Sequence, residues 1–114
     1  MTVYDVDGYD LNFWFSEDTQ GWRVNAYPYD KDGEWISFDR GMRSWFDLEV
    51  NNVEVAELKL GDPANEYAVD EDFWADARWM ISDYPHLSAS FMPKIMSLPK
   101  RVEIKNNELL KVEE

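Results

Sequence analysis

The sequence predicts an α+β fold in a single domain, residues 1–114. Segments in which apolar and polar residues alternate fill most of residues 2–60, and a helical stripe of apolar residues follows at 70–84. A short second helix and a hairpin complete the pattern. We therefore expect an antiparallel sheet of about four to six strands, built mainly from residues 2–60 and packed by one face on the helix 70–84.

Alternation with a period of two residues predicts the strands. Within 9–15, Leu11 and Phe13 fall on one face and Trp14 falls on the other. The other segments that alternate in this way are 22–29, 35–39 and 45–50. A polar second face is typical of an antiparallel sheet that has water on one side.

Turn residues separate these strands. The stretch DKDG at 30–33 predicts a tight hairpin, because Asp and Gly tolerate positive φ. A similar D-x-D-G pattern at 5–8 leads us to expect that 2–4 pairs with 9–15. The segment 53–60 has two interpretations. Its valines favour a strand, whereas the Gly-Asp-Pro after it is typical of a helix end, and we expect a strand.

The helix 70–84 would bury a stripe with spacings of three and four residues. The stripe consists of Phe73, Ala77, Met80, Ile81 and Tyr84. Asp70 is suited to be the N-cap, and Pro85 ends the helix. Farther on, we expect a short helix at 91–98, with Pro93 in its first turn, and a C-terminal β-hairpin at 101–112.

The opposite face of the helix 70–84 is a candidate partner-binding site. It would carry three carboxylates around one indole, from Asp72, Asp76, Trp79 and Asp83. Tryptophan is enriched among the residues that dominate interface affinity. In the alternative interpretation Trp79 packs under neighbouring loops, and the aspartates merely keep the helix hydrated.

The net charge of −13, from 24 acidic and 11 basic residues, limits the possible partners. A surface of this sign repels nucleic acid and anionic membranes and attracts basic proteins. We therefore expect no direct contact with nucleic acid or membrane. The chain has no secretory signal at its start and no apolar run long enough to span a bilayer, so we expect a cytoplasmic protein. Solubility alone is the other explanation of the acidity.

Few residues suit catalysis or metal binding. There is no cysteine, and His86 is the one histidine, so thiol sites and multi-histidine metal sites are excluded. Neither D-x-D-G segment fits a calcium loop. In the segment at 5–8, Val3 and Trp14 would stand at the first and last ligand positions, and in the segment at 30–33, Pro28 would stand at the first. We expect no metal, no cofactor and no enzymatic activity.

In composition the chain looks like two groups of small acidic proteins, bacterial toxin-immunity proteins and phage anti-defence proteins that imitate the charge of DNA. This resemblance implies a stoichiometric inhibitor that docks an acidic, aromatic face on the basic site of a partner, such as a nuclease or another enzyme that acts on nucleic acid. The alternative is a carbohydrate- or small-ligand-binding module that uses exposed rings of Trp14, Tyr27 and Trp35. A small enzyme is the third possibility.

Overall fold

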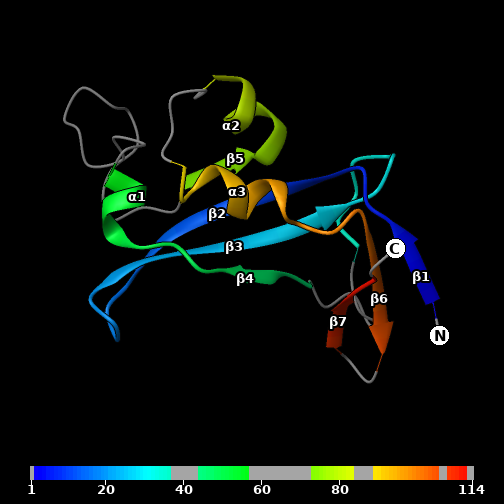
Figure 1. Ribbon diagram of the computed structural model, residues 1–114. Coiled ribbons are helices and arrows are strands. Elements are labelled where there is room, and N and C mark those ends of the chain that lie inside the picture. The colour runs from blue at the N-terminus through cyan, green and yellow to red at the C-terminus, as the bar shows by residue number, and fades with distance from the viewer. Residues whose placement is uncertain (1, 37–43, 57–72, 84–88, 106–107, 113–114) are drawn as a thin grey trace.

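The computed structural model describes residues 2–36, 44–56, 73–83, 89–105 and 108–112, and this part of the chain is mostly β (Figure 1). Its strands are β1 (Thr2–Asp5), β2 (Gly8–Ser16), β3 (Gly21–Tyr29), β4 (Phe46–Leu48), β5 (Phe73–Asp76), β6 (Arg101–Lys105) and β7 (Glu108–Lys111). Its helices are α1 (Asn52–Ala56), α2 (Ala77–Asp83) and α3 (Met92–Met96). The strands form two antiparallel sheets, and none of the described helices has the length and apolar character needed to cross a membrane.

The larger sheet has the strand order β4-β3-β2-β5. Its centre is the pair β2 and β3, which are joined residue by residue from Gly8 opposite Tyr29 to Ser16 opposite Gly21. The connecting turn passes through Gln20, whose φ is 53°. The alternation predicted for 9–15 and 22–29 is therefore confirmed, and it sets which side chains face the core.

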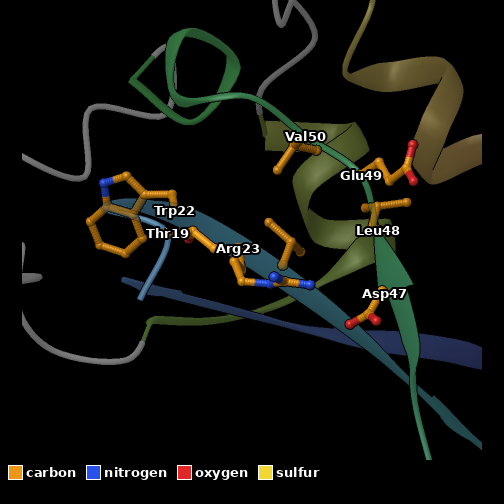
Figure 2. Close-up of a pocket in the computed structure, with 8 residues that line it drawn as sticks. Thr19, Trp22, Arg23, Asp47, Leu48, Glu49 and Val50 are labelled. Carbon is orange, nitrogen blue, oxygen red and sulfur yellow. The ribbon is translucent and has the colours of Figure 1, made fainter. Parts of the chain in front are cut away.

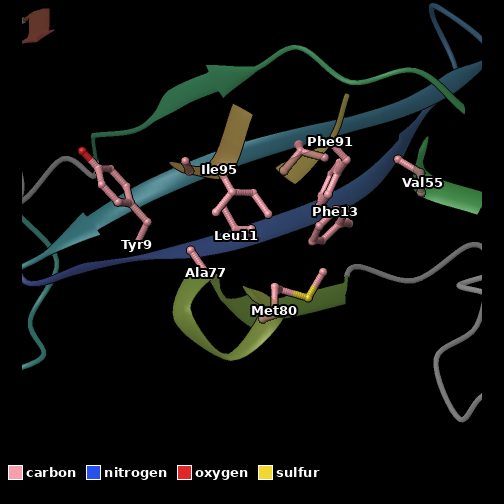
Figure 3. Packing of buried hydrophobic residues seen from close by; sticks show 11 residues of the cluster. Tyr9, Leu11, Phe13, Val55, Ala77, Met80, Phe91 and Ile95 are labelled. Atoms are coloured by element: carbon pink, nitrogen blue, oxygen red, sulfur yellow. The ribbon is translucent and has the colours of Figure 1, made fainter. Parts of the chain in front are cut away.

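The three helices cover one face of this sheet, and the main core lies between them (Figure 1). Figure 3 shows Leu11 and Phe13 of β2 among side chains from all three helices. The buried side chains of this core belong to Tyr9, Leu11, Phe13, Val24, Ala26, Val55, Ala75, Ala77, Met80, Phe91 and Ile95. Short helices suffice here because apolar burial, not helix propensity, supplies most of their stability.

The expected helix 70–84 is wrong over its first described part. Residues 73–76 form β5, which pairs antiparallel with the free edge of β2, and helix α2 covers 77–83. Asp76 is the residue that caps α2, because its Oδ1 accepts the backbone N–H of Arg78 at 2.8 Å. The predicted burial of Met80 is confirmed, whereas 70–72 and 84 lie outside the described residues.

The expected strand 53–60 is also wrong over its described part, because Asn52–Ala56 is the helix α1. A reciprocal capping box explains its start. The Glu54 amide donates to Asn51 Oδ1 at 2.9 Å, and the Asn51 amide donates to Glu54 Oε2 at 2.8 Å. These two bonds satisfy orphan donors of the first turn, which outweighs the strand preference of the valines. Residues 57–60 lie outside the described part of the chain.

A second sheet has the order β1-β6-β7. The hairpin of β6 and β7 confirms the prediction for 101–112. The expected pairing of 2–4 with 9–15 is wrong, because β1 pairs with β6. The break between β1 and β2 is held by Val6 and Asp7, whose amides donate to the carbonyls of Lys100 and Tyr29, both at 2.9 Å.

The turn at 30–33 and the helix α3 agree with the predictions in character. Gly33 has a φ of 78°, and Asp30 Oδ1 accepts the amides of Asp32 and Glu34 at 2.9 and 3.1 Å. Beyond this turn Trp35 makes an isolated bridge with Tyr29, and 37–39 of the expected strand 35–39 lie outside the described residues. α3 is shorter than 91–98 and has a proline in its first turn.

Two methionines on helices test the placement of the core. Met80 is fully buried, whereas Met96 is 70% exposed. We expect Met80→Ala to lower the free energy of unfolding by about 2–5 kcal/mol, the range of buried large-to-small changes. Met96→Ala, the matched control, should change it by less than about 0.5 kcal/mol. Urea denaturation measures both, and similar losses in the two variants would contradict the orientation of α2.

An ion pair between a buried glutamate and a half-buried lysine makes stability depend on pH. Glu54 is buried, and its Oε2 accepts a hydrogen bond from Lys94 Nζ at 3.1 Å. Burial raises the pKa of Glu54, but hydrogen bonds from Ser90, the Asn51 amide and Lys94 outweigh it, so the pKa lies below 4.5. The stabilisation is therefore present above pH 4.5 and is lost as the pH falls through the lowered pKa.

We expect Glu54→Gln to cost about 1.5–3 kcal/mol at pH 7, as the loss of a hydrogen-bonded charge does. The difference from the wild type should shrink below pH 4.5, because the wild-type carboxyl then becomes neutral too. Denaturation curves between pH 7 and pH 3 measure this. A difference that stayed constant over that range would contradict the ion pair.

Candidate functional site

The four-stranded sheet has a second face, opposite the three helices, which we call the outer face. Alternation along the strands assigns to it Asp10, Asn12, Trp14, Arg23, Asn25, Tyr27, Tyr29, Asp47, Trp74 and Asp76. The register aligns Asp47, Asn25, Asn12 and Trp74 in one row across the four strands, and Asp76, Asp10 and Tyr27 in another. Aromatic, carboxylate and amide side chains from distant parts of the sequence therefore share one surface.

Four rings on the outer face contact one another, and we call Tyr27, Trp35, Trp45 and Trp74 the aromatic cluster. The Tyr27 ring centre lies 5.1, 5.5 and 5.2 Å from those of Trp35, Trp45 and Trp74. Trp35 and Trp74 stack at 5.3 Å. Tyr27 is buried under the indoles, whereas Trp45 and Trp74 are 45% and 40% exposed. Each ring pair stabilises the fold by about 0.5–1.5 kcal/mol beyond the contribution of its buried area. These contacts order the cluster, while Trp45 and Trp74 keep it open to solvent.

Asp10 fixes the position of Trp35 in this cluster. The turn at 30–33 reverses the chain, and the bridge to Tyr29 places Trp35 beside β3. Trp35 Nε1 then donates to Asp10 Oδ2 at 2.6 Å. A hydrogen bond to a carboxylate is stronger than one between neutral groups. The indole of Trp35 is therefore held by its edge, next to Tyr27 and Trp74.

One end of the outer face holds a network of Tyr29, Asp76 and Arg78. The Tyr29 hydroxyl donates a hydrogen bond to Asp76 Oδ2. It also accepts a hydrogen bond from Arg78 Nη2 at 2.6 Å. A Cβ at Gly8 would overlap the Tyr29 ring, so this strand position requires glycine. Burial and the hydrogen bond to Asp76 raise the pKa of Tyr29 to about 12. Asp76 is thus engaged within the protein, both with Tyr29 and with Arg78.

At the other end of the outer face, Trp14 is anchored by Asn25. With its amide oriented to satisfy both neighbours, Asn25 accepts Trp14 Nε1 at 3.2 Å and donates to Asp47 Oδ1 at 3.0 Å. The Arg23 guanidinium lies over the Trp14 ring, 5.9 Å from its centre. Trp14 is therefore held by its contacts with Asn25 and Arg23, and it does not belong to the aromatic cluster.

A pocket of about 240 Å³ opens beside this end, between β3 and the stretch that begins with β4 (Figure 2). It is lined by Thr19, Trp22, Arg23, Val24, Asp47, Leu48, Glu49 and Val50. Figure 2 shows the Arg23 side chain extended toward the strand that carries Asp47. The pocket combines an apolar wall with charges of both signs, and its volume lies below the range of about 300–1,000 Å³ that is typical of small-molecule sites.

The helical face that was to unite the predicted partner-binding residues does not form. Asp76 lies on β5, whereas Trp79 lies on α2 and is 39% exposed. Asp83 ends α2, and its side chain lies outside the described residues, as does all of Asp72. The spacing argument for a single acidic stripe is therefore wrong, because it assumed a helix where the chain forms a strand.

The alternative set fares differently. Tyr27 and Trp35 do come together, whereas Trp14 lies in the separate network with Asn25. Sequence reasoning missed Trp45 and Trp74. Trp45 precedes a strand whose outward residue is Asp47, so alternation alone indicates it. Trp74 has no such signal, since its face is decided by pairing with a strand about sixty residues earlier.

Comparison with protein-family models, curated proteins and solved structures gives no match. Within the described residues, no group of three or more histidine, aspartate or glutamate side chains is placed to hold a metal ion. A proposal on function therefore rests on the geometry of the outer face and on the charge of the chain.

The Tyr29 network predicts a loss of stability at high pH. Because the pKa of Tyr29 is raised from 10 to about 12 in the folded state, its stabilisation is present below pH 10 and is lost as the pH rises through 12. Tyr29→Phe should cost about 0.5–1.5 kcal/mol at pH 7. Its free energy of unfolding should also fall less than that of the wild type between pH 10 and 12, as measured by urea denaturation. Equal slopes would contradict the network.

Proposed function

We propose that the protein is a small acidic binding module that docks its outer face on a basic protein partner and inhibits it one to one. One observation carries this proposal: two of the four rings that contact one another in the aromatic cluster, Trp45 and Trp74, are 45% and 40% exposed on a protein of charge −13. Exposed, preorganised tryptophans are typical of the residues that dominate binding energy.

The chemistry of the outer face suits a division of tasks. The cluster supplies rigid apolar area whose ordering cost was met on folding, which favours slow dissociation. The overall negative charge speeds the approach of a basic surface and orients it. We therefore place the contact at the aromatic cluster and its neighbouring carboxylates, and not on the helix face around Trp79.

The partner class follows from the charge. Basic sites of this kind occur on nucleases and other enzymes that act on nucleic acid, and an acidic protein seated there excludes the substrate. Inhibition of this type matches toxin-immunity and phage anti-defence proteins, acts in the cytoplasm and requires no catalysis by the inhibitor. The protein itself would contact neither nucleic acid nor membrane.

A second candidate is a module that binds a carbohydrate or another small ligand. The observation that favours it is Asn12, whose buried amide nitrogen has no hydrogen-bond acceptor among the described residues. It stands in the row between Asn25 and Trp74. Proteins that bind sugars commonly stack the sugar on an aromatic ring and donate hydrogen bonds to it from neighbouring amides. The four rings of the cluster, however, pack mainly against one another, in two stacked and two tilted pairs, which leaves few free ring faces.

A matched pair of tryptophans separates the outer face from the helix. Trp74 and Trp79 are 40% and 39% exposed, on β5 and α2 respectively. We expect Trp74→Ala to speed dissociation from the partner about 30-fold or more, equivalent to about 2 kcal/mol. Trp79→Ala should change the dissociation rate less than about threefold. Surface-binding kinetics on a partner isolated from the host with the wild-type protein would measure both.

Charge reversal supplies the control. Asp47→Lys, at an exposed position, should slow association at low salt, and the defect should shrink when salt is raised, since the Debye length falls to about 8 Å at physiological ionic strength. The reverse order of the two tryptophan variants would move the site to α2. An acidic partner surface would end the proposal, and saturable sugar binding without a protein partner would favour the second candidate.

A further inference from the structure

The strand β1 lies at one edge of the smaller sheet. It pairs antiparallel with β6, and Figure 1 shows it at the outer side of the order β1-β6-β7. A backbone hydrogen bond just past the strand shows which residues bond to β6. The Val6 amide donates to the Lys100 carbonyl at 2.9 Å, and these two residues continue the register of the pair by one step.

The backbone groups of Val3 and Asp5 point away from β6. In an antiparallel pair every second residue bonds to the partner strand, and the residues between them face the other way. Because the Val6 amide bonds on the β6 side, those of Val3 and Asp5 do not. Arg101, opposite Asp5, agrees with this alternation, since its carbonyl accepts the Val112 amide at 3.1 Å on the far side of β6. Among the described residues, no group accepts a hydrogen bond from the Val3 or Asp5 amide.

The next residue on the same side shows what this edge accepts. The Asp7 amide donates to the Tyr29 carbonyl at 2.9 Å, at the end of β3. The turn at 30–33 then leads the chain away. β3 therefore supplies an acceptor to Asp7 and stops before it reaches Asp5 and Val3.

A groove of about 350 Å³ lies at this place. It is lined by residues 3–7, Asp30 and Lys31. No residue of β6 belongs to this lining, so the groove follows the side of β1 that faces away from β6. Val3 and Tyr4 are 39% and 36% exposed. The groove thus combines apolar side chains with outward-pointing backbone groups.

The charge of the groove indicates its occupant. Asp5, Asp7 and Asp30 line it together with a single amine, that of Lys31. The side chains of Asp5 and Asp7 are 93% and 47% exposed, although an arginine of the chain lies 3.5 Å from the first and 3.6 Å from the second. A second copy of this protein, itself of charge −13, would bring like charges together along the strand. The groove therefore suits a segment of positive charge.

We propose that β1 takes up an extended, basic segment of a partner protein as an additional strand. The backbone of the segment bonds to the amides and carbonyls of Val3 and Asp5. Since side chains alternate along a strand, its lysines or arginines lie on the face of Asp5 and Asp7, and its apolar residues lie on the face of Tyr4 and Val6. The proposal shares only the sign of the partner's charge with the docking of the outer face, and it does not depend on the aromatic cluster.

The test adds the capped heptapeptide Lys-Val-Lys-Val-Lys-Val-Lys to the intact protein and follows amide hydrogen exchange by NMR. At saturating peptide, we expect exchange of the Val3 and Asp5 amides to slow about 10-fold or more, because new hydrogen bonds protect them. The amides of Tyr4 and Asp7 are the internal controls. Both already have acceptors within the protein, so their exchange should change little.

Proline variants at the two edges of the sheet isolate the backbone contact. Val3→Pro removes one outward N–H and leaves the bonds to β6 in place, as proline does on edge strands. It should weaken the peptide about fivefold, the effect of one lost hydrogen bond. Leu109→Pro is the matched control, because the same alternation points the Leu109 amide outward on β7, at the opposite edge. It should leave the affinity unchanged.

The peptide with glutamate in place of lysine should not bind, because its charge matches that of the groove. Circular dichroism shows whether each variant folds, and exchange in the wild-type protein decides the question even if Val3→Pro does not fold. Absence of binding by the basic peptide would overturn the proposal. So would unchanged exchange at Val3 and Asp5 with the peptide bound, or equal affinity in a folded Val3→Pro protein.

The outer face is judged by a different measurement. If the peptide leaves β1 unprotected while Trp74→Ala still weakens the host partner, strand addition fails and the docking of the outer face stands. If Trp74→Ala has no effect on the partner while Val3 and Asp5 become protected, the docking of the outer face fails and strand addition stands.

Discussion

The antiparallel pairing of β2 with β3 sorts the large side chains of this protein onto two surfaces. Nine residue pairs lock the register, so that Leu11 and Phe13 face the helices while Trp14 faces the other way. A slip of one residue would exchange the two sets completely. The core, the outer face and the attachment of β4 and β5 all follow from this one register. The most extensive contact in the structure is thus also the one that decides where function can reside.

Features coded by neighbouring residues were predictable from the sequence, and features decided by distant ones were not. Alternation in 9–15 and 22–29 and the turn at 30–33 are local, and all three appear as expected. The segment 73–83 misled because its apolar spacing suits a helix throughout, whereas the edge of β2 recruits its first four residues as a strand. The capping box at Asn51 is local too, but the valines beside it favoured a strand.

The candidate site shows the same division more sharply. Tyr27 and Trp35 could be assigned to one face from alternation, and they are in contact. Trp74 joins them because β5 pairs with β2, a contact that no spacing rule reveals. The acidic stripe failed for the corresponding reason, since Asp76 and Trp79 belong to different elements. Charge and aromatic content therefore suggested the kind of surface, and tertiary pairing decided its location.

The length of the strands at the edges of the larger sheet has a consequence for solubility. β2 and β3, with nine residues each, lie inside the sheet, whereas β4 and β5 have three and four. An edge this short offers few unpaired amides to a second chain. β4 covers 24–26 of β3, and β5 covers 10–13 of β2. Asp47 and Asp76 add charge to those edges. Short, charged edge strands thus lower the tendency to stack edge to edge, as in amyloid-like aggregation, in a protein that displays tryptophans to solvent.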